Sequence, residues 1–264
     1  MLKGIDISNW QAGLILSTLD IDFCIAKATE GNYFVDYCCD GFIRGAKALG
    51  LKWGFYHFAN DNDPVTECDF FIANTKGYDG EGIPVLDYEV WGQNADVSWC
   101  EKFLKHYHDR TDVYPLLYIS AANCVHFRDS WIPEKCGLWV AGYPHDARTW
   151  VNPDSMPYDI APWKFAALWQ FTSGLVLENR PLDGDFAYMD AKAWDKYAHG
   201  DKKGKKADTP ILPNKPVKTC EQLADEVIAG KWGTGSERQK KLDSVFGDGT
   251  YKHVQAIVNR KLGE

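Results

Sequence analysis

The sequence lacks the patterns that usually mark a metal centre, a membrane segment or a nucleic-acid surface. Its 8 cysteines form no CxxC pair, and no histidine stands at zinc-finger spacing from them. No apolar run approaches the length that crosses a bilayer. The net charge is -8, whereas binding to a phosphate backbone requires a basic face. We therefore expect no metal, no other cofactor, no nucleic-acid partner and no membrane insertion.

The N-terminus and the cysteine content add two further exclusions. The segment MLKGIDISNW has no apolar stretch after its first lysine, so we expect no signal peptide and synthesis in the cytoplasm. Cysteine is too sparse for a disulfide scaffold, which predicts mostly reduced core residues. Aromatic residues are plentiful at 14%, and they suit either a large core or a carbohydrate-binding cleft.

Residues 1–197 alternate short β-rich runs with amphipathic helical stretches, among them 36–49, 64–76 and 98–110. This alternation predicts βαβ units around a parallel sheet, and thus an α/β fold. Eight strands in this length is the number of a closed β/α barrel, with fewer helices after residue 115. The expected strands are 4–8, 23–29, 52–58, 83–89, 115–120, 138–142, 166–171 and 182–188.

The composition changes after the expected barrel. Residues 198–218 are rich in lysine and proline and have almost no apolar periodicity, which predicts a linker. From residue 219 to 264 the pattern predicts three short helices, with Ile228, Leu242 and Leu262 among the inward-facing residues. Three short helices in this length form a minimal bundle with a thin core.

The segment GIPVLDYEVW carries the first candidate catalytic pair, Asp87 and Glu89. Side chains two positions apart on a strand share a face, so both carboxylates are expected to project together, with Cα atoms roughly 6.6 Å apart. The apolar run before them places the pair at the carboxyl end of a barrel strand, where β/α barrels hold their active sites. Two such acids suit glycoside hydrolysis, in which one donates a proton and the other stabilises positive charge.

Two further acids are expected at the same end of the barrel. Asp6 lies in the first strand and Asp183 in the last, and these strands are neighbours in a closed barrel. Several like charges in one cleft should raise at least one pKa into the range of a general acid. The same acids would also suit a metal-dependent barrel hydrolase, although no histidine accompanies them in these motifs.

Six segments, in the family's own order, resemble glycoside hydrolase family 25, the Chalaropsis-type lysozymes that include many phage endolysins. The resemblance implies a flattened barrel of eight strands with about five helices. It also implies an N-acetylmuramidase that hydrolyses the β-1,4 bond between N-acetylmuramic acid and N-acetylglucosamine in peptidoglycan. The segments are GIDISNWQ at the N-terminus, AKATEG at 26–31, WGFYHF at 53–58, PVLDYE at 84–89, LWVAGY at 138–143 and ALWQFT at 167–172.

The resemblance implies roles for the acids. Glu89 protonates the glycosidic oxygen, and Asp87 either stabilises the anomeric centre or orients the 2-acetamido group of the substrate as the nucleophile. Asp6 and Asp183 position water and tune the neighbouring pKa values. The segment LDGDF also offers Asp185 as the last-strand acid, because it replaces the family's usual asparagine.

Aromatic and amide side chains near the strand ends are expected to bind the sugar. His57 is expected to pack inside the barrel, since the carboxylates already supply the chemistry. Trp91 follows the acidic pair directly, and the other candidates occupy positions that resemble sugar-lining residues of the family. The expected substrate-binding residues are Tyr56, Trp91, Trp139, Tyr143, Trp169 and Gln170.

The tail resembles a second known unit, the CW-seven wall-binding repeat of phage lysozymes. The resemblance lies in LADEVIAGKWGTGSERQKKL and YKHVQAIVNRKL, and FGDGTY departs from the usual Gly-Tyr-Asp-Tyr stretch. It implies that the tail binds peptidoglycan, with Trp232 and Arg238 as candidate contacts. Together the two resemblances imply a phage endolysin, made in the host cytoplasm and acting on the wall after release.

Three other classes were weighed against this interpretation. A family 18 chitinase requires DxxDxDxE, but Gly82 and Val85 stand at the two earlier aspartate positions. A metal-dependent hydrolase and a non-catalytic wall-binding protein remain as alternatives. The sequence makes no prediction of oligomeric state, host species, cross-link preference or stereochemical outcome.

Overall fold

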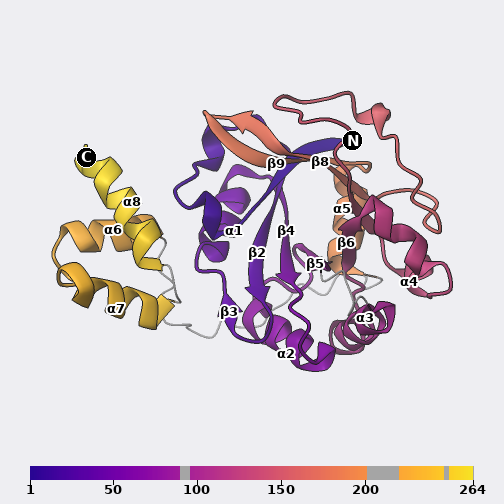
Figure 1. Ribbon diagram of the computed structural model, residues 1–264, viewed down its shortest axis with the longest axis horizontal. Coiled ribbons are helices and arrows are strands. Elements are labelled where there is room, and N and C mark those ends of the chain that lie inside the picture. Colours follow the sequence, from indigo (N-terminus) through magenta and orange to yellow (C-terminus); the bar gives the residue numbers. More distant parts are fainter. Residues whose placement is uncertain (90–95, 201–219, 247–249, 264) are drawn as a thin grey trace.

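The computed structural model describes residues 1–89, 96–200, 220–246 and 250–263. Its centre is a barrel closed by eight strands, to which the short β3 (Phe34–Val35) adds an edge (Figure 1). All eight predicted strands are present, which confirms the predicted barrel. They are β1 (Leu2–Ile7), β2 (Phe23–Glu30), β4 (Lys52–Phe58), β5 (Ile83–Asp87), β6 (Leu116–Ser120), β7 (Leu138–Ala141), β8 (Leu168–Leu177) and β9 (Arg180–Ala187).

The sheet is parallel from β1 through β2, β4, β5, β6 and β7 to β8. The last strand differs, because β8 and β9 form an antiparallel hairpin and β9 then pairs antiparallel with β1. The turn of the hairpin holds Glu178 and Asn179, both with positive φ, which gives the backbone the tight reversal that joins antiparallel strands. The barrel therefore closes without a helix between its last two strands.

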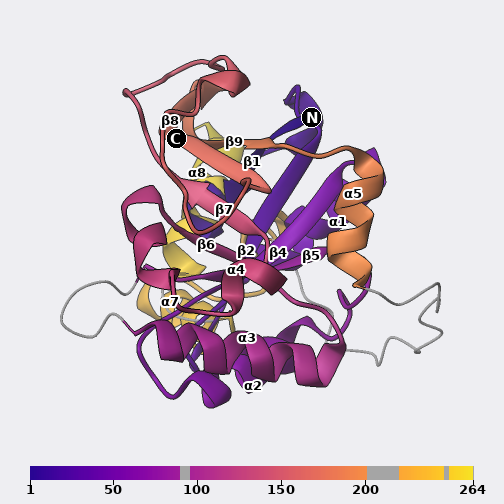
Figure 2. The same ribbon diagram turned by 90° about the vertical axis from the view of Figure 1, so that its right-hand side faces the viewer.

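In the part of the chain that the structure describes, five α-helices accompany the barrel, as the family resemblance implies. Figure 2 shows α2 and α3 side by side along one side of the sheet. Asp63 caps α2 and Asp96 caps α3 by accepting a backbone N–H bond, so two helices begin where the sequence supplies an acceptor. The helices are α1 (Cys39–Leu49), α2 (Pro64–Thr75), α3 (Val97–Thr111), α4 (Ile132–Lys135) and α5 (Ala191–His199).

Alternation along the strands produces two apolar cores. The inner core includes Phe23, Ile25 and Val85 inside the barrel, and Trp194 of α5 packs into it. The outer core lies between the sheet and the helices, and it includes Phe55, Phe71 and Phe103. The seven cysteines that precede the tail are free and buried, as predicted for most of the cysteines.

The expected placement of His57 requires correction. His57 lies on the outer face of β4, where its ring stacks on Phe103 at 5.1 Å, and not inside the barrel. The reason is the strand alternation, which turns Tyr56 inward and its neighbour outward. The last helix of this part of the chain, α5, ends at His199, close to the expected barrel boundary at residue 197, and its Ala198 is buried in the inner core.

The three predicted tail helices are α6 (Cys220–Ile228), α7 (Gly235–Phe246) and α8 (Thr250–Leu262), placed to one side of the barrel (Figure 1). Leu242 is buried, as expected, but Ile228 is 44% exposed and Leu262 is 56% exposed. Both lie at the last residue of their helix, where the bundle no longer covers them. The linker expected at 198–218 lies almost entirely outside the described residues. None of the described helices is both long and apolar enough to cross a membrane.

Candidate active site

The strand ends of the barrel open into a cavity of about 280 Å³ lined by four carboxylates. Asp6, Asp87 and Glu89 reach it from β1 and from the end of β5, where parallel strands meet at one edge. Asp183 comes from β9, which runs in the opposite direction, and it lies near the start of that strand directly opposite Asp6. The structure therefore brings together the four acids that the sequence predicts as catalytic.

Asp87 and Glu89 differ in their surroundings. The strand expected over 83–89 ends at Asp87, so the two acids do not share one strand face as the sequence suggested. Asp87 is 8% exposed, and its Oδ1 is buried without a hydrogen-bond partner among the described residues. Glu89 lies two residues beyond the strand and is exposed. One acid is thus enclosed, and the other reaches both the cavity and water.

Burial and mutual repulsion raise the pKa of the enclosed acids, as predicted for such a cluster. Burial raises the pKa of Asp6 to about 6, although a hydrogen bond from Gln170 opposes the rise. Burial, followed by repulsion from Asp6, raises the pKa of Asp183 to about 8. The pKa of Asp87 rises well above its ordinary value because of burial first and then the charges of Glu89 and Asp6.

Asp185, the alternative last-strand acid, occupies a different position. It is fully buried, and its Oδ1 accepts a hydrogen bond from Nε1 of Trp139 at 2.9 Å. Burial and the nearby Asp6 raise its pKa well above the ordinary value. Asp183 lines the cavity, whereas Asp185 lies behind the wall that Trp139 helps to form. The geometry therefore favours Asp183 as the acid that meets a ligand.

Gln170 connects the acids to the aromatic wall. Its Nε2 donates to Asp6 Oδ2 at 2.7 Å, and its Oε1 accepts from the hydroxyl of Tyr118 at 2.8 Å and from that of Tyr143. The amide is 3% exposed and uses its groups on protein partners. Gln170 lines the cavity as expected, and in this arrangement it fixes Asp6.

Of the predicted sugar-binding rings, Tyr56, Trp139 and Tyr143 line the cavity. Tyr143 is 45% exposed, so its ring is open to a ligand. Trp169 requires correction, because it is fully buried on the outer face of β8 against Phe171 and does not line the cavity. The candidate residue Trp91 lies outside the described residues.

The cavity also includes residues that the sequence analysis did not single out. Tyr118 is inward-facing on β6, which its position in the strand alternation would have shown. Trp10 is 75% exposed and follows the first strand within a segment already quoted. Nothing in the sequence marked Lys27 as a site residue, because a lysine in an otherwise apolar strand suggests the solvent-exposed edge of a sheet and not the wall of a binding cleft. The additional lining residues are Ile7, Ser8, Trp10, Gln11, Lys27, Phe58 and Tyr118.

The two candidate contacts in the tail both make internal bonds. Nε1 of Trp232 donates to Glu226 at 3.0 Å. Arg238 donates from Nε to the carbonyl of Gly233 at 3.0 Å and from Nη1 to Gln255 at 2.8 Å. Arg238 therefore ties the start of α7 to α8, and both side chains are half-buried.

The arrangement of acids bears on the chemistry. Within the described ranges, no group of three or more His, Cys, Asp or Glu side chains is placed to hold a metal ion. An enclosed carboxylate beside an accessible one, at the carboxyl end of a β/α barrel and among aromatic rings, is the site of a glycoside hydrolase.

Comparison with known proteins identifies the family. The model of the Glycosyl hydrolases family 25 matches residues 5–179, and that of the CW_7 repeat matches residues 221–262. The chain belongs to glycosyl hydrolase family 25, which confirms the predicted family, and it carries a CW_7 repeat in its tail.

Individual relatives agree with this assignment. The N,O-diacetylmuramidase of Chalaropsis sp is 26% identical over 199 residues, which cover 64% of this chain and 87% of the relative. The lysozyme of Streptococcus phage Cp-7 is 24% identical over 250 residues, 91% of this chain and 62% of the relative. Among the curated relatives, the matched region spans 31% of the length of the autolytic lysozyme of Clostridium acetobutylicum and 87% of that of the Chalaropsis enzyme. The family GH25 lysozyme from Aspergillus fumigatus superimposes with a TM-score of 0.59 at 27% identity, covering 75% of this chain and 99% of that one.

Proposed function

We propose that this chain is an N-acetylmuramidase that hydrolyses the β-1,4 bond between N-acetylmuramic acid and N-acetylglucosamine in bacterial peptidoglycan. The observation that carries the proposal is the cavity of about 280 Å³ in which four carboxylates from β1, β5 and β9 converge. Relatives named lysozyme and N,O-diacetylmuramidase supply the substrate class.

Glu89 acts as the general acid. A general acid must reach the leaving oxygen in the cavity and then regain its proton from water. Glu89 lines the cavity and is exposed, so it has access to both. Asp87 is enclosed and has no comparable route to water.

Asp87 supports the anomeric centre. Asp87 lines the cavity, and its Oδ1 has no hydrogen-bond partner among the described residues, which leaves one acceptor for a donor on the substrate. The N–H of a 2-acetamido group is such a donor, and this bond would orient the acetamido oxygen toward the anomeric carbon. The negative charge of Asp87 also stabilises the transition state more strongly as positive charge develops on the anomeric carbon.

Asp6 and Asp183 bind and activate water on the neighbouring strands. Their direct pairing across β1 and β9 places two acceptors side by side, and Gln170 holds Asp6 in orientation. Around them, Tyr143 offers an exposed ring on which a sugar can stack, and the buried Tyr56 and Trp139 form part of the cavity wall.

The tail supplies attachment to the wall. The proposed division into a barrel over 1–197, a linker over 198–218 and a helical module over 219–264 is supported by the separate family matches at 5–179 and 221–262. Trp232 and Arg238 are the proposed contacts, with the internal bonds presenting them in fixed orientation. The relationship to the lysozyme of Streptococcus phage Cp-7 supports a phage endolysin that acts on the wall after release from the host cytoplasm.

The proposal is tested by release of soluble fragments from purified peptidoglycan, with the full chain and with Glu89→Gln, each with and without a chelator. We expect release by the full chain at the same rate with the chelator, and a loss of about 10²–10⁴-fold in the variant. Loss of activity in the chelator would support a metal-dependent hydrolase. Wall binding without any release would support a non-catalytic protein.

A further inference from the structure

The acidic cavity also contains a basic residue. Among its described lining residues, Lys27 alone carries a positive charge. It lies on β2 opposite Tyr56 of β4, one strand away from Asp6 and two from Asp87. It is only 9% exposed. A lysine with so little water around it requires compensation for its charge from the protein.

Three side chains supply this compensation. The Nζ of Lys27 lies 2.5 Å from Oε2 of Glu30, which is on the same strand. It also lies 4.6 Å from the ring centre of Phe58 and 5.6 Å from that of Phe34. Both rings are within the range of cation–π attraction. The ammonium group therefore has a fixed position between a carboxylate and two aromatic faces.

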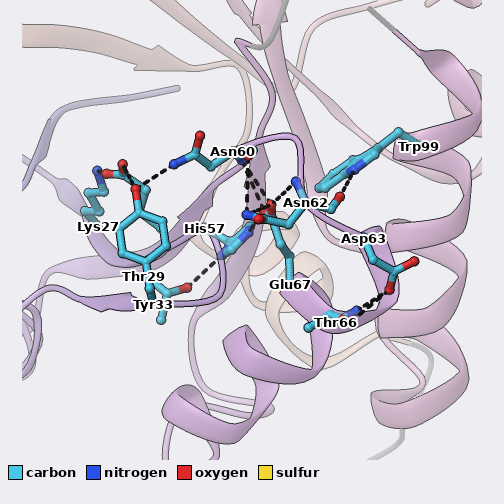
Figure 3. A network of polar contacts seen from close by, with 11 residues as sticks. Lys27, Thr29, Tyr33, His57, Asn60, Asn62, Asp63, Thr66, Glu67 and Trp99 are labelled. Carbon is cyan, nitrogen blue, oxygen red and sulfur yellow. Dashed lines mark hydrogen bonds and ion pairs between the residues drawn. The ribbon is translucent and has the colours of Figure 1, made fainter. Parts of the chain in front are cut away.

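Glu30 is in turn held from the other side. Its Oε1 accepts a hydrogen bond from the hydroxyl of Tyr33 at 3.0 Å, and that hydroxyl accepts one from Nδ2 of Asn60 at 2.6 Å. The backbone N–H of Asn60 donates to Oε2 of Glu67 at 3.1 Å. Figure 3 shows Lys27, Tyr33, Asn60 and Glu67 in one line of polar contacts, from the cavity to the start of α2.

The far end of this line is fully enclosed. Glu67 also accepts bonds from the backbone N–H of Asn62 at 2.8 Å and from Nε2 of His57 at 2.8 Å. Nδ1 of His57 meets the hydroxyl of Thr29 at 2.8 Å (Figure 3). Burial lowers the pKa of His57, so the ring is neutral, donates from Nε2 and accepts at Nδ1. The network outside the barrel thus fixes the position of the ion pair inside it.

We propose that Lys27 is a positioning residue for the hydrolysis: its ammonium group favours the charged form of Asp87 against the burial and like charges that disfavour it, and Glu30 limits how strongly it does so. This inference rests on the proposed function. Without Lys27, the described residues that line the cavity around ionised Asp87 carry like charge or are neutral, among them Glu89, Asp6 and Asp183 together with the hydroxyls of Tyr56 and Tyr118.

The two members of the ion pair act on Asp87 with opposite sign. Lys27 lowers the pKa of Asp87, whereas Glu30 raises it, and both effects are smaller than those of burial, Glu89 and Asp6. Removing either charge should therefore move the titration of Asp87, in opposite directions. A residue that merely supports the fold would not give paired shifts of opposite sign.

The test is the dependence of kcat/KM on pH with soluble glycan fragments as substrate. Activity falls on the acidic side as Asp87 takes up a proton. In Lys27→Met, the acidic limb of the profile, where kcat/KM falls with decreasing pH, should move to higher pH by about one pH unit. In Glu30→Gln, the unpaired ammonium group should move the limb to lower pH by a similar amount. Lys27→Arg keeps the charge and should leave the limb in place.

Lys52→Met is the matched control for removal of a strand lysine. Lys52 pairs with Asp195 at 2.6 Å and does not line the cavity, so its loss should not move the limb. If Lys27→Met does not fold, Glu30→Gln decides alone, because it preserves the shape of the side chain. Limbs that stay in place, or that shift in the same direction in both variants, would overturn the inference. Absence of muramidase products from the unmodified chain would instead overturn the proposed function.

Discussion

Replacement of Asp6 by asparagine should stabilise the fold at neutral and alkaline pH while abolishing activity. Asp6 is 7% exposed and lies among other acids, so its ionised form is costly in the folded chain. Asparagine keeps an oxygen that can accept the hydrogen bond from Gln170, which reaches Asp6 at 2.7 Å. The substitution therefore removes a charge and keeps the contact.

The size of the effect follows from the pKa. Burial raises the pKa of Asp6 from the ordinary 3.8 to about 6 in the folded chain. Below pH 3.8 the group is protonated in both states and does not penalise folding. Between pH 3.8 and about 6 the unfolded chain ionises this group while the folded chain keeps it protonated, so folding loses up to about 3 kcal/mol, and this loss stays constant above pH 6. The figure follows because a shift of one pKa unit corresponds to about 1.4 kcal/mol.

The assay is urea unfolding of the parent and Asp6→Asn at pH 4 and pH 8, followed by tryptophan fluorescence. At pH 8 the variant should be more stable by about 3 kcal/mol, and at pH 4 the two should differ by much less. The slopes with urea should agree between the chains, which shows that the same surface is exposed. A variant that is destabilised at pH 8, or equally affected at both values, would refute the account of Asp6 as a strained buried acid.

Three further predictions concern other parts of the chain. Asp87→Asn should reduce turnover nearly as much as loss of the general acid. If the substrate supplies the nucleophile, glycan without N-acetyl groups should resist cleavage by the parent enzyme. Efficient cleavage of that glycan, analysed by chromatography, would argue against this route. Glu67→Gln should lower the free energy of unfolding by about 1–3 kcal/mol, measured in urea at pH 7, because an amide can replace only one of the two buried oxygens that accept bonds from His57 and from the backbone of Asn62. An unchanged midpoint would contradict the importance of these bonds. A chain ending at Gly200 should cleave soluble fragments at the parental rate but lyse intact walls poorly at low enzyme concentration, because it lacks the tail that raises its concentration at the wall. Lysis equal to that of the full chain at every concentration would assign the tail another role.

Much of the barrel could be predicted because its local patterns agree with its fold. The inner strand IPVLD is continuously apolar before its acid, and Asp63 stands directly before Pro64 at the start of α2. Such signals depend only on neighbours in the chain. The antiparallel course of β9 has no such signal, because it depends on which neighbour completes the barrel.

The site was predictable where strand position determines it. Asp6 and Asp183 were expected together because the first and last strands of a barrel meet, and they are paired residues. Trp169 was placed wrongly because its neighbour Gln170 takes the inward position on β8. Lys27 was missed because its partners Glu30, Phe34 and Phe58 become a cage only in the folded chain.

The most direct test of the central claim is the chemical identity of the new reducing end. Purified peptidoglycan is digested with the full chain, the products are reduced with borohydride, and the terminal sugar alcohol is identified by mass spectrometry. The account predicts muramitol, since cleavage by a muramidase leaves N-acetylmuramic acid at the reducing end. Glucosaminitol, or free amino groups without a new reducing end, would contradict it.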